Sequence, residues 1–194
     1  MSANRDNPKT QVARIAIIVG NPKPMSRTRD VAEAIAHTIT QMFHAENVIC
    51  ETRLYDLATM APYMFDAKSD VVASAVRDVC SASLLVVASP TYKGTYTGLL
   101  KAFLDWFRQG SLQKIVTIPV MLGSSPRHAM AVELYLRSLL VELGGVVPTH
   151  GLYILEDQLE NLPSVIDPWA HVAKPSLLST LARLHEPTGA EKNL

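Results

Sequence analysis

Residues 84–98 read LLVVASPTYKGTYTG. The first five form the most apolar run of the chain, and Ser89 and Pro90 end it. A short apolar run without polar alternation is typical of a strand that is buried on both faces. A turn-rich segment follows, and a helical pattern begins at Gly98. This stretch predicts the central strand of a parallel sheet, with a polar loop at its carboxyl end.

Strand and helix patterns alternate along the rest of the chain. Strands are expected at 13–19, 48–55, 84–88, 114–122 and 146–155, and helices at 31–43, 71–81, 98–107, 129–143 and 167–184. Strands that are joined by helices lie parallel, because the right-handed crossovers cover both faces of the sheet. Pro119 lies inside the fourth strand and predicts irregular pairing there, since proline lacks a ladder donor. The fold class is therefore α/β, with helices on both faces of a five-stranded parallel sheet.

Length and composition bound the class of protein. The chain has 194 residues, 48% of them hydrophobic and 19% charged, which predicts one domain with a substantial core. We expect this domain to cover 13–185, between flexible segments at 1–12 and 186–194. Eighteen basic residues balance eighteen acidic ones, which argues against nucleic acid or a membrane surface as a partner. Two cysteines and a polar start predict a cytoplasmic protein, and no metal site is expected.

The first candidate site is the loop after the first strand, GNPKPMSRTR at 20–29. Ligands of parallel sheets bind beyond the carboxyl ends of the strands. This loop leads into a helix N-terminus, whose unpaired N–H groups suit a phosphate, and Ser26, Arg27 and Thr28 add hydroxyls and positive charge. The glycine patterns of P-loops and dinucleotide folds are missing. The alternative is that Ser26 only caps the helix.

Two further loops at the same edge suit a flat ring. The second loop, at 89–98, contains Gly94 and Gly98, which free backbone N–H groups to meet the polar edge of a heterocycle, and either Tyr92 or Tyr96 is expected to pack beside it. The third loop, GSSPRH at 123–128, supplies small residues against which a ring lies flat. The alternatives are a turn-rich connection for the second loop and an N-cap role for Ser125 in the third.

The three loop sequences together carry a resemblance. VGNPKPMSRTR, ASPTYKGTYTGLLKAFLDW and MLGSSPRHA, in this order and spacing, resemble the NAD(P)H-dependent FMN reductase family, and most closely the reductases that supply reduced FMN to sulfonate monooxygenases. The similarity covers about 13–155. It implies a three-layer flavodoxin-like fold with strand order 2-1-3-4-5, FMN at the loop edge, NADPH or NADH as the electron donor, and a homodimer or homotetramer.

The resemblance also implies the site residues. The FMN phosphate would be held by Ser26, Arg27 and Thr28. The isoalloxazine would be framed on one side by Pro90, Thr91, Tyr92, Lys93 and Gly94, and on the other by Gly123, Ser124 and Ser125. No side chain is expected to be catalytic, because the cofactor supplies the reactivity and the protein supplies position.

Two positions depart from the pattern of the family. Asn21 stands where relatives often carry serine, which removes one hydroxyl from the phosphate loop. Tyr135 lies near the position at which some sulfonate-linked reductases carry an extra aromatic residue that widens the helix.

The sequence thus predicts an enzyme that transfers hydride from a nicotinamide to FMN and passes the reduced flavin to a partner monooxygenase. One alternative is a reductase that keeps its FMN and reduces a quinone or an azo dye. Another is a non-catalytic electron carrier of the flavodoxin type, which the neutral charge disfavours because flavodoxins are typically acidic. A third is a nucleotide-binding module without catalysis.

Overall fold

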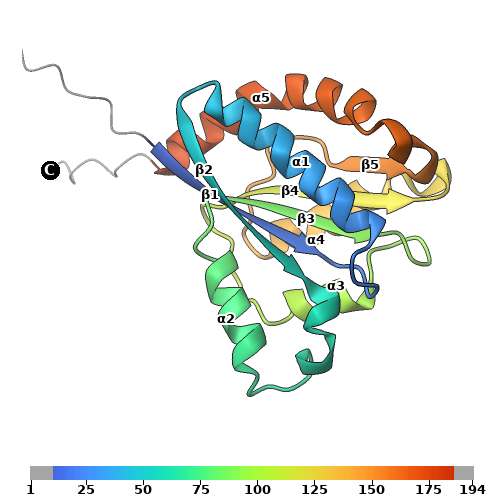
Figure 1. Ribbon diagram of the computed structural model, residues 1–194. Helices are drawn as coiled ribbons and strands as arrows, with labels where there is room; N and C mark the ends of the chain where they lie inside the picture. The colour runs from blue at the N-terminus through green and yellow to red at the C-terminus, as the bar shows by residue number, and fades with distance from the viewer. Residues whose placement is uncertain (1–10, 186–194) are drawn as a thin grey trace, which may run out of the picture.

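A parallel five-stranded sheet forms the centre of the computed structural model, which describes residues 11–185 (Figure 1). Its strand order is β2-β1-β3-β4-β5, as the flavodoxin-like prediction requires. The strands are β1 (Gln11–Val19), β2 (Val48–Asp56), β3 (Leu84–Pro90), β4 (Val116–Gly123) and β5 (Leu152–Leu155). The fold class and the strand order are confirmed.

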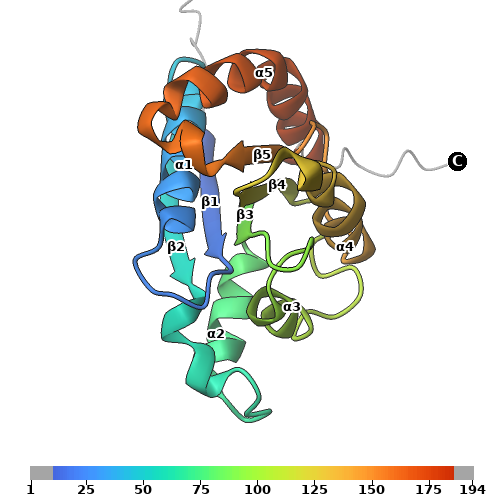
Figure 2. The ribbon, with the colours of Figure 1, turned by 90° about the vertical axis from the view of Figure 1, so that its right-hand side faces the viewer.

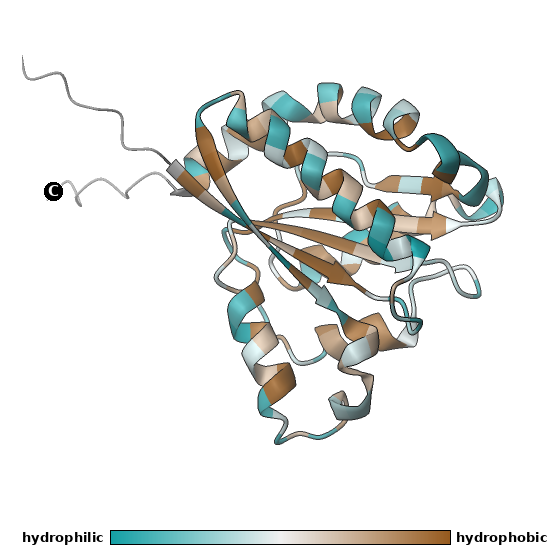
Figure 3. Cartoon of the chain, in the orientation of Figure 1, coloured by the Kyte–Doolittle hydropathy of each residue, from teal (hydrophilic) through white to brown (hydrophobic). Residues whose placement is uncertain are grey.

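Helices cover both faces of the sheet, as Figures 1 and 2 show. One face packs against α1 (Arg27–His44) and α5 (Pro163–His185). The other packs against α2 (Asp70–Val79), α3 (Gly98–Leu104) and α4 (Ser138–Glu142). Every residue of β3 is buried, and its side chains enter the two cores alternately. β3 and β4 are accordingly largely hydrophobic in Figure 3, whereas β2 is hydrophilic along its middle, and the outer sides of α1 and α5 are largely polar.

The first strand begins earlier than the sequence predicted. β1 begins at Gln11 rather than at residue 13, because Gln11 and Val12 already pair with Val48 and Ile49 of β2. The rest of the predicted flexible segment 1–12, and the whole of 186–194, lie outside the described residues. Among the described helices, none is both long and apolar enough to cross a membrane.

The fifth strand is shorter than predicted. Val146 makes only an isolated bridge to Val116, and the ladder with β4 begins at Leu152. Pro119 lies between this bridge and the first residue pair of the β4–β5 ladder. Because no ladder passes Pro119 on this side, the missing N–H of the proline interrupts no hydrogen bond to β5. On its other side Pro119 stays in register with Val87 of β3. The predicted irregular pairing therefore occurs on the β5 side alone.

The helix after β4 contains a widened turn that includes Tyr135. Residues Val132–Arg137 form a π-helix that runs directly into α4. Leu134 and Tyr135 on this turn are exposed, whereas Val132 and Leu136 are buried against the sheet. A single widened turn of this kind costs stability and is frequent at functional sites.

Thr97 joins the first and second loops below the protein surface. Its hydroxyl donates to the carbonyl oxygen of Gly20 at 2.5 Å and accepts from the N–H of Leu100 at 3.1 Å, which caps α3. Its own N–H donates to Ser89 Oγ at 3.1 Å. Thr97 is buried, so each of these polar groups depends on the others for its hydrogen bonds.

We expect Thr97→Val to lower the free energy of unfolding by about 1–3 kcal/mol, because it leaves a buried carbonyl and a helix N–H without partners. Urea unfolding of the flavin-free protein measures this change. Thr95→Val is the control, since the Thr95 hydroxyl has no hydrogen-bond partner among residues 11–185. Equal losses in both variants would contradict the role given to Thr97.

Candidate functional site

A pocket of about 400 Å³ lies where β1, β3 and β4 end, at the end of the sheet that faces the viewer in Figure 2. It brings together most of the predicted site residues, namely Ser26, Arg27, Thr28, Pro90, Thr91, Tyr92, Gly123 and Ser124. Lys93, Gly94 and Ser125 lie outside its lining. The rest of the lining was not selected from the sequence and consists of Asn21, Lys23, Met25, Asp30, Leu122 and Glu156.

Ser26 begins α1 but does not cap it with its side chain. The backbone carbonyl of Ser26 accepts from the N–H groups of Arg29 and Asp30, at 2.8 and 3.3 Å. The side chain makes no capping bond, and Oγ is buried with no hydrogen-bond partner in the described part of the chain. Ser26 is the N-cap residue by position, but the alternative that its side chain serves only to cap the helix is not supported. Ser26 is also one of the residues that line the pocket, so its hydroxyl is an unused donor next to it.

Asn21, which stands where relatives often carry serine, makes two side-chain hydrogen bonds within the first loop. Its side-chain amide donates to Thr28 Oγ1 at 3.0 Å, and its Oδ1 accepts from the N–H of Lys23 at 2.9 Å. Asn21 and Thr28 are both buried. Because Thr28 accepts from Asn21, the hydroxyl hydrogen of Thr28 remains available for a ligand. At the end of β2, Asp56 accepts from the N–H of Met25 at 3.4 Å.

The second loop forms a tight two-residue turn. Tyr92 and Thr95 exchange backbone hydrogen bonds of 2.8 and 3.2 Å, with Lys93 and Gly94 at φ of 54° and 82° between them. Both central residues at positive φ define a type I′ turn, for which glycine is favoured. The N–H groups of Lys93 and Gly94 have no acceptor among residues 11–185. The turn thus presents two donors beside Tyr92, although the two residues stand outside the pocket lining.

The third loop is held from β5. Ser125 Oγ accepts from the N–H of Arg127 at 3.4 Å, which confirms the N-cap role that the sequence suggested as an alternative. Tyr153 donates its hydroxyl to the carbonyl oxygen of Ser125 at 2.9 Å. A Cβ on Gly123 would stand 2.0 Å from Tyr153 Oη and 3.3 Å from Thr91 Oγ1. Gly123 is therefore required by close packing, and this contact was not predictable from the loop sequence.

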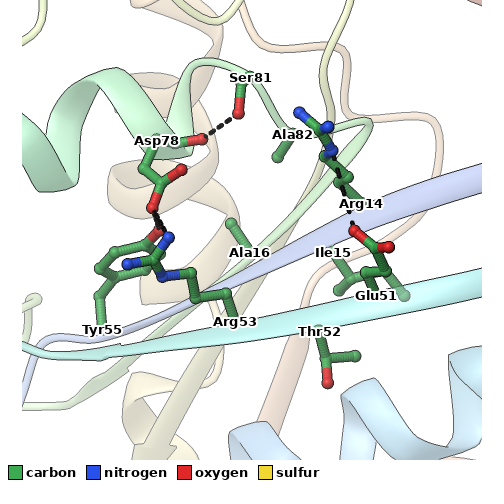
Figure 4. A pocket seen from close by; sticks show the side chains of 10 residues that line it. All are labelled: Arg14, Ile15, Ala16, Glu51, Thr52, Arg53, Tyr55, Asp78, Ser81 and Ala82. Carbon is green, nitrogen blue, oxygen red and sulfur yellow. Dashed lines mark hydrogen bonds and ion pairs between the residues drawn. The ribbon is translucent and has the colours of Figure 1, made fainter.

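A second hollow, of about 380 Å³, lies on the sheet face beside α2 (Figure 4). Its charged groups neutralise one another: Arg14 pairs with Glu51, and Arg53 pairs with Asp78. Tyr55 donates to Asp78 at 2.7 Å, and burial together with this bond raises the pKa of Tyr55. The described groups of this hollow are satisfied internally, whereas the loop pocket contains unsatisfied donors, so the loop pocket is the better ligand site.

The sequence is similar to a known protein family over most of its length. Residues 13–160 match the family described as NADPH-dependent FMN reductase. The chain belongs to this family. The reductase is therefore an oxidoreductase, with FMN and NADPH or NADH as its cofactors.

Characterised relatives of this reductase support the assignment. It is 30% identical to an FMN reductase (NADPH) of Pseudomonas aeruginosa, over 79% of this chain and 82% of that one. It is 27% identical to the NADH-dependent FMN reductase SfnF of Pseudomonas putida, over 74% and 78% of the two chains. The apo form of the NADH:FMN oxidoreductase EMOB is similar in structure, with a TM-score of 0.75 and 27% identity over 91% of this chain and 92% of that one.

The pocket of the reductase fits FMN in its chemistry. Ser26 Oγ and Thr91 Oγ1 are buried and have no hydrogen-bond partner within residues 11–185. An unpartnered buried hydroxyl costs stability unless a ligand or water satisfies it. Both hydroxyls lie in the lining, one at a helix N-terminus and one beside the close-packed Gly123. The first suits a phosphate and the second a polar ring edge.

We expect Gly123→Ala to destabilise the flavin-free reductase by about 1–3 kcal/mol, because the added methyl group displaces the Tyr153 ring and its bond to Ser125. Urea unfolding measures the change. Gly98→Ala is the matched control, since a Cβ there meets nothing within 4 Å. Alanine in that helical position is neutral or stabilising. A stability of Gly123→Ala equal to that of the control would contradict the packing role.

Proposed function

We propose that this reductase transfers hydride from NADPH or NADH to FMN in the loop pocket and releases the reduced flavin to a partner monooxygenase. The bound flavin supplies the redox chemistry, so the chain needs no nucleophile or metal. The task of its own residues is to bind and orient. The alternative, a reductase that keeps its FMN and reduces a quinone or an azo dye, differs in flavin retention and acceptor.

The observation that carries the proposal is the buried, unpartnered hydroxyl of Ser26 at the N-terminus of α1. This helix has 18 residues, and its first-turn N–H groups have no intrahelical acceptor. These donors attract a phosphate, which the positive end of the helix dipole also favours. Arg27 adds a full positive charge, and Thr28 adds a second hydroxyl that Asn21 orients.

The ring end of the flavin is assigned to the second and third loops. Pro90, Thr91 and Tyr92 of the second loop and Gly123 and Ser124 of the third loop line the pocket together. The free N–H groups of Lys93 and Gly94 are donors for the polar edge of the ring. Tyr92 is half exposed, so the ring side of the pocket is open to a second, nicotinamide ring.

Delivery to a monooxygenase is supported by the widened helix at Tyr135, which the family resemblance associates with sulfonate-linked reductases. The exposed apolar side chains on this helix and α4 support a homodimer or homotetramer; they are Met130, Leu134, Tyr135 and Val141. We place the enzyme in the cytoplasm, where reduced nicotinamide nucleotides are made.

We expect Ser26→Ala to weaken FMN binding by about 1.5–3 kcal/mol, the usual scale of a hydrogen bond to a charged group. This corresponds to about a 10- to 150-fold rise in the FMN dissociation constant. Flavin fluorescence titrations measure it. Riboflavin, which lacks the phosphate, is the control and should bind the variant as it binds the wild-type protein. An equal loss for both flavins would refute the phosphate assignment.

The release of flavin is tested by following NADPH oxidation spectrophotometrically. We expect a colourless purified protein whose turnover requires added FMN and rises with its concentration. A yellow protein that oxidises NADPH only after a quinone is added would instead establish the bound-flavin alternative. An absence of NADPH and NADH oxidation under both conditions would leave the electron carrier and the non-catalytic nucleotide-binding module.

A further inference from the structure

Glu156 places a carboxylate at the phosphate end of the pocket. It follows Leu155, the last residue of β5, which pairs with Gly123 of β4. The sheet therefore brings Glu156 to the same edge as the third loop. Gln158 Oε1 accepts from the N–H of Leu155 at 2.9 Å and fixes the start of this segment. Glu156 is accordingly part of the pocket lining, although it lies 129 residues from Arg27 in the chain.

The carboxylate of Glu156 pairs with the cation that is assigned to the phosphate. Arg27 Nη2 donates to Glu156 Oε1 at 3.2 Å, so the pair joins the start of α1 to the end of β5. The side chains of Arg27 and Glu156 are 63% and 41% exposed, so either one can change its contacts without a change in the core. No other carboxylate is paired with Arg27 within the described residues.

A phosphate monoester at this position meets both attraction and repulsion. It carries about −1.5 to −2 charges at pH 7 and binds guanidinium groups through its oxygens. Glu156 occupies part of the donor set of Arg27 and adds a like charge beside the phosphate. Ser26, Thr28 and the N–H groups of α1 are unaffected by this competition.

We propose that Glu156 sets how firmly FMN is held, by competing with the flavin phosphate for Arg27. The inference rests on the proposed function, since it assigns the phosphate to Arg27. It adds a residue that acts against binding and keeps the flavin exchangeable. An enzyme that must release reduced flavin to another protein gains from such a residue, because tight retention would slow delivery.

The test compares FMN dissociation constants of the wild-type protein, Glu156→Gln and Asp157→Asn, measured by fluorescence titration without NADPH. Asp157 is the matched control, because it is adjacent and exposed but does not line the pocket. We expect Glu156→Gln to bind FMN about 2- to 5-fold more tightly, as for a partly exposed ion pair. Asp157→Asn should stay close to wild type, because Asp157 is exposed to solvent, which screens its charge, and lies outside the pocket lining.

Two further comparisons separate the possible causes. Riboflavin should show no gain in Glu156→Gln, because it has no phosphate. In an Arg27→Ala background the gain for FMN should shrink, because the competition for Arg27 is gone and only the repulsion between Glu156 and the phosphate is relieved. Tighter binding of both flavins, or a gain that the loss of Arg27 leaves undiminished, would overturn the inference.

The remaining outcomes also decide the question. Weaker or unchanged FMN binding in Glu156→Gln would overturn it and assign Glu156 a positioning role for Arg27 or none. If the wild-type protein binds FMN no better than riboflavin, the phosphate assignment itself fails, and the role of Glu156 fails with it. A wild-type preference for FMN that Glu156→Gln leaves unchanged would reject the inference on Glu156 alone.

Discussion

The parallel pairing of β3 with β1 and β4 determines where each loop of the pocket begins. Val19 stands beside Ala88, and Pro90 stands beside Leu122, so adjacent strands end almost level with one another. Because β3 is buried along its whole length, a shift of its register would move apolar side chains out of both cores. The relative positions of the three loops are therefore fixed by the core, before any contact between the loops themselves.

Buried polar contacts then fix the shape of each loop. Thr97 joins the second loop to the carbonyl of Gly20, Asn21 orients Thr28, and Tyr153 holds the carbonyl of Ser125. Each of these groups has a partner inside the protein, so the loops are rigid where they leave the sheet. Four buried hydroxyls lack a partner among the described residues, and two of them, Ser26 and Thr91, belong to the lining of the loop pocket, where a ligand could use them.

Charge at the pocket is balanced rather than uniformly positive. The lining contains the cations Lys23 and Arg27 and the carboxylates Asp30 and Glu156, beside the positive end of the α1 dipole. In the proposed complex, directed hydrogen bonds rather than net charge recognise the phosphate. Such a balance agrees with a flavin that enters and leaves during turnover, as a reductase serving a second enzyme requires.

The sequence by itself determined the fold class, the strand order through its family resemblance, and the three loops, because apolar periodicity and local motifs are encoded in neighbouring residues. The three loops follow adjacent parallel strands, and most of the predicted site residues therefore lie in one pocket. Only the tertiary structure decided that Ser26 keeps its hydroxyl free and that Glu156 reaches Arg27. The tertiary structure alone also showed that Tyr153 packs closely against Gly123. These contacts join residues that are distant in the chain, and their geometry depends on how β4 and β5 pair, which no local pattern specifies.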